Sequence, residues 1–384
     1  MLTNYIGRII TRGRRFIPEV DGLRFVAITA VVLYHLSGYT RTKHMTGGAI
    51  GPGEAWFPQV LGLGRYGVQL FFVLSGFLLA MPFAKWRLHL GDKPSLRKYY
   101  LRRLTRLEPP YIVSMLLLFL GGVAALGRTV GLSHSWNLVA SLFYQHNLIY
   151  GDGSVINYVA WSLEVEVQFY LLAPFLASVF SISGTAVRRS LLAVAIVAIP
   201  MARELVPAVI AQRVGLSLPW FLEFFVAGFL LAEFFLIDWK EQPTLLFRYD
   251  LASFTGWSAI LILLLSRRFA ALMAPAVLLA YVGAFRGRAS SWLLSLPAIT
   301  AVGGMCYSMY LLHYAIISIT GRFANRLLWG NSFSARLALE AIFAIPAILV
   351  ATLAFYLVLE RPCMDPTWPL KLRLLLRRHH RTFL

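Results

Sequence analysis

The chain has 384 residues, of which 58% are hydrophobic and only 14% are charged, and its formal net charge is +19. Soluble domains carry about a quarter charged residues, so this composition argues against a soluble enzyme and indicates a polytopic membrane protein. Cytoplasmic loops and anionic lipid head groups account for the positive charge, and no soluble basic domain is left over to bind nucleic acid. The two cysteines, Cys306 and Cys363, are too few for a disulfide framework or a cysteine-rich metal site.

Apolar runs long enough to cross a membrane recur along the whole chain. Ten are predicted to be transmembrane helices, near 22–40, 66–84, 107–126, 158–181, 190–210, 218–236, 251–266, 269–285, 298–320 and 338–359. Segment 136–150 is short and dotted with polar groups, so it leaves open a choice between ten crossings and eleven. With ten, 24 Lys and Arg lie on the side of the termini and 11 on the other. The positive-inside rule therefore favours ten crossings with both termini in the cytoplasm.

The predicted fold class is all-α, a bundle of about ten transmembrane helices that forms a single integral-membrane domain over 1–384. It has a basic N-terminal segment (1–20), a basic cytoplasmic loop (85–106) and a basic C-terminal tail (361–384). The other loops are short, which leaves no room for a second domain. No cleaved signal peptide is expected, because no small-x-small pattern follows the first apolar run.

The first predicted span, "DGLRFVAITAVVLYHLSGY", contains Asp21, Arg24 and His35. Eleven helical residues rise about 16 Å and return to within roughly 20° of the starting direction, so Arg24 and His35 share a face that Asp21 joins. Buried charges are costly in lipid, so this face is expected to line the bundle interior or a water-filled cavity. The structural alternatives are that Asp21 and Arg24 anchor the helix at the membrane interface, and that His35 is a buried histidine hydrogen-bonded to a neighbouring helix.

Two later segments carry further candidate polar groups. Glu164 and Glu166 lie about 200° apart on a helix, so they cannot face the same cavity. Gly67, Ser75 and Gly76 are interpreted as small residues for close helix packing, with a re-entrant turn as the alternative and catalysis by Ser75 disfavoured.

Five segments in order, together with the arginine and histidine of the first span, resemble the integral-membrane acyltransferase-3 family. They are "GVQLFFVLSGFLL" (67–79), "RRLTRLEPPY" (102–111), "WSLEVEVQFYLLAP" (161–174), "YSMYLLHY" (307–314) and "LERP" (359–362). Each is weak alone, and the resemblance covers nearly the whole chain. His313, in an apolar run with Tyr307 and Tyr310, is interpreted as structural rather than catalytic.

The resemblance implies the functional residues. The family's arginine and histidine map onto Arg24 and His35, its basic motif onto Arg103 and Arg106, and its tryptophan-serine and glutamate element onto Trp161, Ser162, Glu166, Phe169 and Tyr170. His35 and Glu166 are the expected catalytic residues, with Glu166 orienting His35. Arg24, Arg103 and Arg106 are expected to bind the donor, although loop 85–106 also fits an orientation signal that contacts lipid phosphates. Asp21, Trp161, Ser162, Tyr170 and Ser75 are expected to bind substrate or support the site.

The resemblance also implies the reaction. Family members move an acyl group, usually acetyl, from acyl-coenzyme A to a hydroxyl, most often of a sugar in a bacterial envelope glycan or glycolipid. His35 is expected to act as a general base or to carry the acyl group. Macrolide-like acceptors remain an alternative. The expected location is the bacterial inner membrane, with no metal and no extracytoplasmic hydrolase-like domain, and the oligomeric state stays open.

A transporter of a lipid-linked sugar is the rival interpretation, since buried Arg, His and Glu in many spans also suit a substrate or proton pathway. Inverted repeats would support it, and none is evident in the sequence.

Overall fold

The computed structural model describes residues 16–44, 50–51, 53–266, 269–327, 332–365 and 367–369, and these residues form helices and turns without a strand. Most of the predicted N-terminal basic segment and C-terminal basic tail lies outside this range. The helices are α2 (Pro18–His44), α3 (Trp56–Gly62), α4 (Gly67–Arg87), α5 (Leu96–Leu126), α6 (Arg128–Ser133), α7 (Ser135–Leu142), α8 (His146–Tyr150), α9 (Trp161–Leu176), α10 (Thr185–Arg203), α11 (Ala208–Val214), α12 (Leu222–Glu233), α13 (Arg248–Ser266), α14 (Met273–Arg286), α15 (Arg288–Leu294), α16 (Pro297–Gly304), α17 (Cys306–Ala324), α18 (Phe333–Phe355) and α19 (Arg361–Cys363). Short 3-10 or π turns join several of them: η1 (Leu63–Tyr66), η2 (Tyr158–Ala160), η3 (Ala177–Ser181), η4 (Leu218–Trp220), η5 (Phe234–Asp238), η6 (Ala270–Leu272), η7 (Asn325–Leu327) and η8 (Tyr356–Glu360).

Many of these helices are long and apolar enough to cross a membrane. In the described part of the chain seven qualify by length and composition: Pro18–Lys43, Trp56–Arg87, Leu96–Ala125, Tyr158–Ser181, Thr185–Arg203, Arg248–Ser266 and Phe333–Cys363. Two bent pairs of helices raise the number to as many as nine if each pair is one span. The chain is therefore an all-α, multi-pass membrane protein, as the sequence predicts.

The predicted span 298–320 contains a sharp bend in the structure, and another bend follows directly after the predicted span 269–285. The helix Ala270–Arg286 is followed by α15 at an angle of 87°, and α16 meets α17 at 72°. The second bend places Met305 between two helices, so the predicted span 298–320 is broken rather than straight. The bend places Cys306 and Tyr307, at the start of α17, beside a cavity described below.

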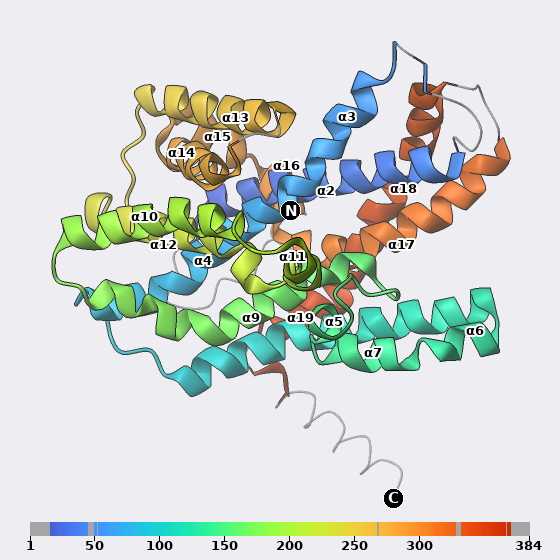
Figure 1. Ribbon diagram of the computed structural model, residues 1–384, viewed down its shortest axis with the longest axis horizontal. Helices are drawn as coiled ribbons and strands as arrows, with labels where there is room; N and C mark the ends of the chain where they lie inside the picture. Colours follow the sequence, from blue (N-terminus) through green and yellow to red (C-terminus); the bar gives the residue numbers. More distant parts are fainter. Residues whose placement is uncertain are drawn as a thin grey trace, which may run out of the picture.

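The ambiguous segment 136–150 forms two short helices, α7 with eight residues and α8 with five. A helix needs about 20 residues to cross the hydrocarbon core, so neither helix can span it alone. In Figure 1, α6 and α7 run back beside the end of α5. This arrangement agrees with the alternative in which the segment does not cross, whereas the described part of the chain has seven to nine candidate spans rather than ten.

Close helix contacts at small residues hold the centre of the bundle together. A Cβ atom on Gly228 of α12 would lie 2.3 Å from the Val73 carbonyl oxygen and 2.5 Å from the Phe77 nitrogen, both in α4. A Cβ on Gly76 of α4 would lie 2.2 Å from the Phe225 carbonyl oxygen of α12. The two glycines thus let the backbones come into contact, which confirms the packing interpretation for Gly76 of "GVQLFFVLSGFLL". Helix α4 is continuous through them, so the re-entrant alternative is wrong.

Gly228→Ala is expected to destabilise the protein by about 1–3 kcal/mol, because the added methyl group meets backbone atoms that cannot move without separating α4 from α12. The melting temperature of the purified protein in detergent measures this loss. Gly121→Ala is the matched control, since a Cβ at that position of α5 meets no atom within 4 Å. Equal melting temperatures for the two variants would show that the close contact is not needed.

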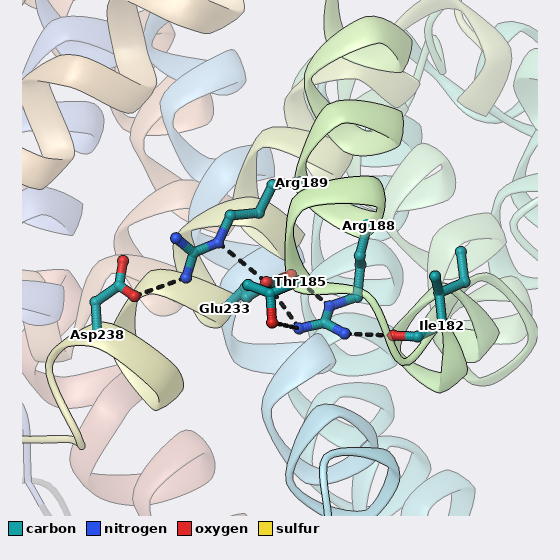
Figure 2. Close-up of polar contacts among 6 residues, drawn as sticks. All are labelled: Ile182, Thr185, Arg188, Arg189, Glu233 and Asp238. Carbon is teal, nitrogen blue, oxygen red and sulfur yellow. Dashed lines mark hydrogen bonds and ion pairs between the residues drawn. The ribbon is translucent and has the colours of Figure 1, made fainter.

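A buried ion-pair network joins α10 to α12 at one end of the bundle (Figure 2). Arg188 donates from Nε and Nη2 to the two carboxylate oxygens of Glu233, at 2.8 and 2.9 Å, and to the Ile182 carbonyl. Arg189 bridges Glu233 and Asp238, at 3.1 and 2.7 Å. The side chains of Arg188 and Glu233 are 2% and 0% exposed, so each charge depends on the other for compensation.

Candidate active site

The first transmembrane helix presents its polar residues along one side. Arg24 of α2 donates to Asp21 across 2.6 Å, one turn earlier in the same helix. Both Arg24 and His35 face α17: Arg24 lines a cavity together with Cys306, and His35 contacts His313. The shared face that the sequence predicts for Asp21, Arg24 and His35 is therefore present.

A cavity of about 110 Å³ lies among α2, α4, α5, α9, α17 and η8, and it is called the arginine cavity here. Its polar lining comprises Arg24, Ser75, Arg103, Arg106, Ser162, Glu166, Tyr170, Cys306, Tyr307, Tyr310 and Glu360. Leucines and phenylalanines complete the wall: Phe71, Phe72, Leu74, Leu78, Leu79, Leu107 and Leu163. The cavity thus joins three cations to an apolar surface.

The three arginines come from two separate parts of the chain. Arg103 and Arg106 lie one turn apart on α5, and Arg24 lies on α2. The Arg103 guanidinium stands 5.3 Å from the centre of the Tyr170 ring, whose face favours a cation. Arg102, the adjacent residue, is exposed and does not line the cavity. Clustered guanidinium groups are suited to bind phosphate or carboxylate oxygens.

The two glutamates of α9 face different neighbours, as their spacing predicts. Glu166 lines the arginine cavity and accepts a hydrogen bond of 2.5 Å from the Ser75 hydroxyl of α4. Glu164 is buried on the other side, where it accepts the backbone N–H of Asn147 at 2.8 Å. Glu164 therefore ties α9 to α8, while Glu166 and Ser75 are available to a ligand in the cavity.

Ser162 and Tyr310 form the part of the cavity wall that leads toward the histidines. The Tyr310 hydroxyl donates to the Val159 carbonyl at 2.7 Å, so the hydrogen bond of 2.6 Å between Ser162 and Tyr310 has Ser162 as its donor. Trp161 instead packs its ring against Phe221 with centroids 5.4 Å apart and does not line the cavity. Of the predicted supporting residues, Ser162, Tyr170 and Ser75 thus reach the site directly.

His35 lies against a second histidine on α17. The ring centroids of His35 and His313 are 5.3 Å apart, and the Tyr314 ring stands 5.0 Å from His35. The His313 ring lies 5.8 Å from that of Tyr310, a residue of the cavity wall. The pair His35–His313, called the histidine pair here, is therefore about one helical turn beyond the arginine cavity.

The hydrogen bonds of His313 determine which of its nitrogens carries a proton. Nδ1 lies 3.0 and 2.9 Å from the carbonyl oxygens of Met309 and Tyr310, which can only accept, so Nδ1 is the donor. Nε2 is buried and has no hydrogen-bond partner among the described residues. In the neutral ring Nε2 is then a free acceptor in the interior, where unpaired polar atoms are rare and point to function.

The sequence interpretation of His313 as structural is thus incomplete, because no local pattern reveals which side chain it meets. The segment "YSMYLLHY" carries the family resemblance and an apolar pattern, and neither feature indicates a partner for His313. The structure likewise does not place Glu166 against His35: the ring neighbours of His35 are Tyr34, His313 and Tyr314, and Glu166 bonds Ser75.

Glu360 of η8 also lines the cavity, and the sequence indicates it only as part of the segment "LERP". Its carboxylate accepts from the Ser308 N–H at 3.1 Å and from the Ser308 hydroxyl at 2.5 Å, which joins η8 to α17. Within the described ranges, no group of three His, Cys, Asp or Glu side chains could hold a metal ion.

Comparisons with known proteins agree on one family. Residues 17–361 match the acyltransferase-3 family model, described as an acyltransferase domain. The peptidoglycan O-acetyltransferase OatA of Listeria monocytogenes is 30% identical over 179 residues, which are 44% of this chain and 25% of that protein. The O-acetyltransferase OatA of Staphylococcus aureus is 29% identical over 171 residues, 42% of this chain and 24% of that protein. The matched region is thus about a quarter of the length of these relatives, and no solved structure matches.

Proposed function

The chain belongs to the acyltransferase-3 family, and we propose that it moves an acyl group, acetyl in the first instance, from acyl-coenzyme A to a hydroxyl of a glycan or glycolipid. The arginine cavity carries the proposal, because it gathers the three predicted donor-binding cations, and its wall at Tyr310 contacts the histidine pair that contains the predicted catalytic residue. The relatives named O-acetyltransferases support acetyl as the group and a sugar as the acceptor class. The proposed location is the bacterial inner membrane, with both termini in the cytoplasm.

The proposed donor site uses the charges of the arginine cavity. Arg103, Arg106 and Arg24 would bind phosphate oxygens of the donor, with the bidentate geometry that guanidinium groups favour. The apolar wall of α4, including Phe71 and Leu78, would contact the thioester arm. Glu166, held by Ser75, stays a proposed catalytic residue, and its contacts favour a role on this donor path rather than the orientation of His35.

The proposed transfer takes place at the histidine pair. His35, which is only partly buried, takes the proton of the acceptor hydroxyl while the hydroxyl oxygen attacks the thioester carbonyl carbon. The carbon–sulfur bond then breaks, and the proton passes from the imidazolium to the departing thiolate, which leaves as a thiol. His313 is fully buried and fixed by two carbonyls, so it acts through His35 by limiting where that ring can turn.

The donor arginines allow a direct test. Arg103→Gln and Arg106→Gln are each expected to raise KM for acetyl-coenzyme A by about tenfold or more and to change kcat little, because a hydrogen bond to a charged group contributes about 1.5–3 kcal/mol. The measurement is transfer of radiolabelled acetyl from acetyl-coenzyme A to envelope glycan in reconstituted membranes.

Arg102→Gln is the matched control, because this exposed neighbour has the same charge and does not line the cavity. A KM for the Arg102 variant that rises as much as the KM for the Arg103 variant would mean that general charge, and not the cavity, attracts the donor. Wild-type protein that moves labelled sugar without modifying it would instead favour the transporter.

A further inference from the structure

A second pocket lies toward the C-terminal ends of α2 and α17, the two helices that carry the histidine pair, whereas the arginine cavity lies toward their N-terminal ends. It has a volume of about 440 Å³ and is lined by Tyr39, Lys43, Ser318, Arg322 and Arg326, and it is called the basic pocket here. Lys43, Arg322 and Arg326 supply three positive charges, and no carboxylate is part of the lining. Within the described ranges, none of these three cations forms an ion pair with Asp or Glu.

The basic pocket is aligned with the arginine cavity and the histidine pair. Helices α2 and α17 lie side by side and run in the same direction, since Arg24 and Cys306 share the arginine cavity and the Tyr39 hydroxyl donates to the Ser318 carbonyl at 3.3 Å. Tyr39 follows His35 by one helical turn and Lys43 follows it by two. At 1.5 Å per residue these positions are about 6 Å and 12 Å beyond His35 along the helix.

A buried carboxylate lies close to the basic pocket without being part of its lining. Glu340 of α18 is fully buried and accepts the Thr40 hydroxyl at 2.8 Å. Its Oε1 atom would lie 2.9 Å from a Cβ atom on Gly321, a position that also contacts Tyr39. Glu340 is not part of the pocket lining. Three mutually repelling cations in one concave site are stabilised when an anion binds among them.

We infer that the basic pocket binds a carboxylate or phosphate of the acceptor and thereby holds the acceptor hydroxyl at His35. This inference rests on the proposed function and names its acceptor class, a negatively charged glycan or glycolipid. Tyr39 and Lys43 lie about 6 and 12 Å beyond His35 along α2, a span of one to two sugar units, so the anion belongs to the same sugar as the reacting hydroxyl or to its neighbour. Donor and acceptor then approach the histidine pair from opposite ends of α2.

Binding of trigalacturonic acid and of its trimethyl ester tests the inference, because the two sugars share their free ring hydroxyls and differ in charge. The full chain is placed in nanodiscs of neutral phosphatidylcholine, and affinity is measured by calorimetry. Wild type should bind the acid at least about tenfold more tightly than the ester. Arg322→Gln should remove most of that difference and leave the affinity for the ester unchanged, which also shows that the variant is folded.

Arg41→Gln is the matched control, because Arg41 is exposed on α2 and does not line the pocket. Equal binding of acid and ester by wild type, or equal effects of the Arg322 and Arg41 variants, would overturn the inference. Nanodiscs that contain phosphatidylglycerol test whether the natural anion is a lipid head group rather than part of the acceptor. If that lipid abolishes binding of the acid, the pocket is a lipid site and the inference is wrong.

Acetyl transfer measured with the same two sugars separates this inference from the proposed function. Transfer to acid and ester with the same KM would support the proposed acyltransferase activity and contradict the proposed role of the basic pocket. Charge-dependent binding without any transfer from acetyl-coenzyme A would support the anion site and contradict the proposed acyltransferase activity.

Discussion

His35→Asn is expected to lower kcat for acetyl transfer by about 10²–10⁴-fold, the usual contribution of a positioned general base. The KM for acetyl-coenzyme A should stay within about twofold, since His35 does not line the arginine cavity that would bind the donor, and Arg24 lies eleven residues, about 16 Å, from it along α2. Asparagine retains hydrogen-bonding capacity but cannot take a proton, so the loss isolates proton transfer. The measurement is steady-state transfer by wild type and variant at matched amounts of inserted protein.

His313→Asn is expected to lower kcat less than His35→Asn does, by about 10–100-fold, because His313 is buried and acts through His35. The double variant should be no slower than His35→Asn alone, which is the result for residues that act as a unit. His89→Asn serves as the control, since His89 is exposed and has a positive φ of 60° that asparagine tolerates. Full activity of His35→Asn would show that transfer takes place elsewhere.

The largest loss of stability is expected for Glu233→Gln, by about 3–5 kcal/mol, because it leaves the Arg188 guanidinium buried beside a neutral amide. Arg188 cannot lose its proton at any ordinary pH, so the uncompensated charge stays in the interior. Figure 2 shows that Arg188 has no other carboxylate within the network. The melting temperature in detergent and the yield of inserted protein measure the effect.

Two further variants separate charge from packing. Glu233→Leu combined with Arg188→Met should be more stable than Glu233→Gln alone, since replacing a buried ion pair by apolar residues of similar volume is often neutral. Arg189→Gln should cost much less, because the Arg189 side chain is 28% exposed. If Glu233→Gln melts at the same temperature as Arg189→Gln, the buried pair does not hold α10 against α12.

Features that depend on local helical geometry could be predicted from the amino-acid sequence. Apolar runs of about 20 residues identify an all-α membrane protein, because a helix of that length crosses the hydrocarbon core with all its backbone hydrogen bonds formed within the segment. The 3.6-residue period placed Asp21, Arg24 and His35 on one side of α2 and separated Glu164 from Glu166, and the structure confirms both. These properties follow from residues a few turns apart.

Contacts between side chains that are distant in the sequence depend on how the helices pack, and they could not be predicted from the sequence. The histidine pair joins residues 35 and 313, the arginine cavity adds Glu360 to Arg24, and the buried pair joins residues 188 and 233. The 72° bend at Met305, which brings Cys306 and Tyr307 to the cavity, and the backbone contact at Gly228 likewise depend on how whole helices pack. Helix periodicity gives the direction of each side chain, whereas its partner depends on helix crossings and on close contacts at small residues, which no single segment encodes.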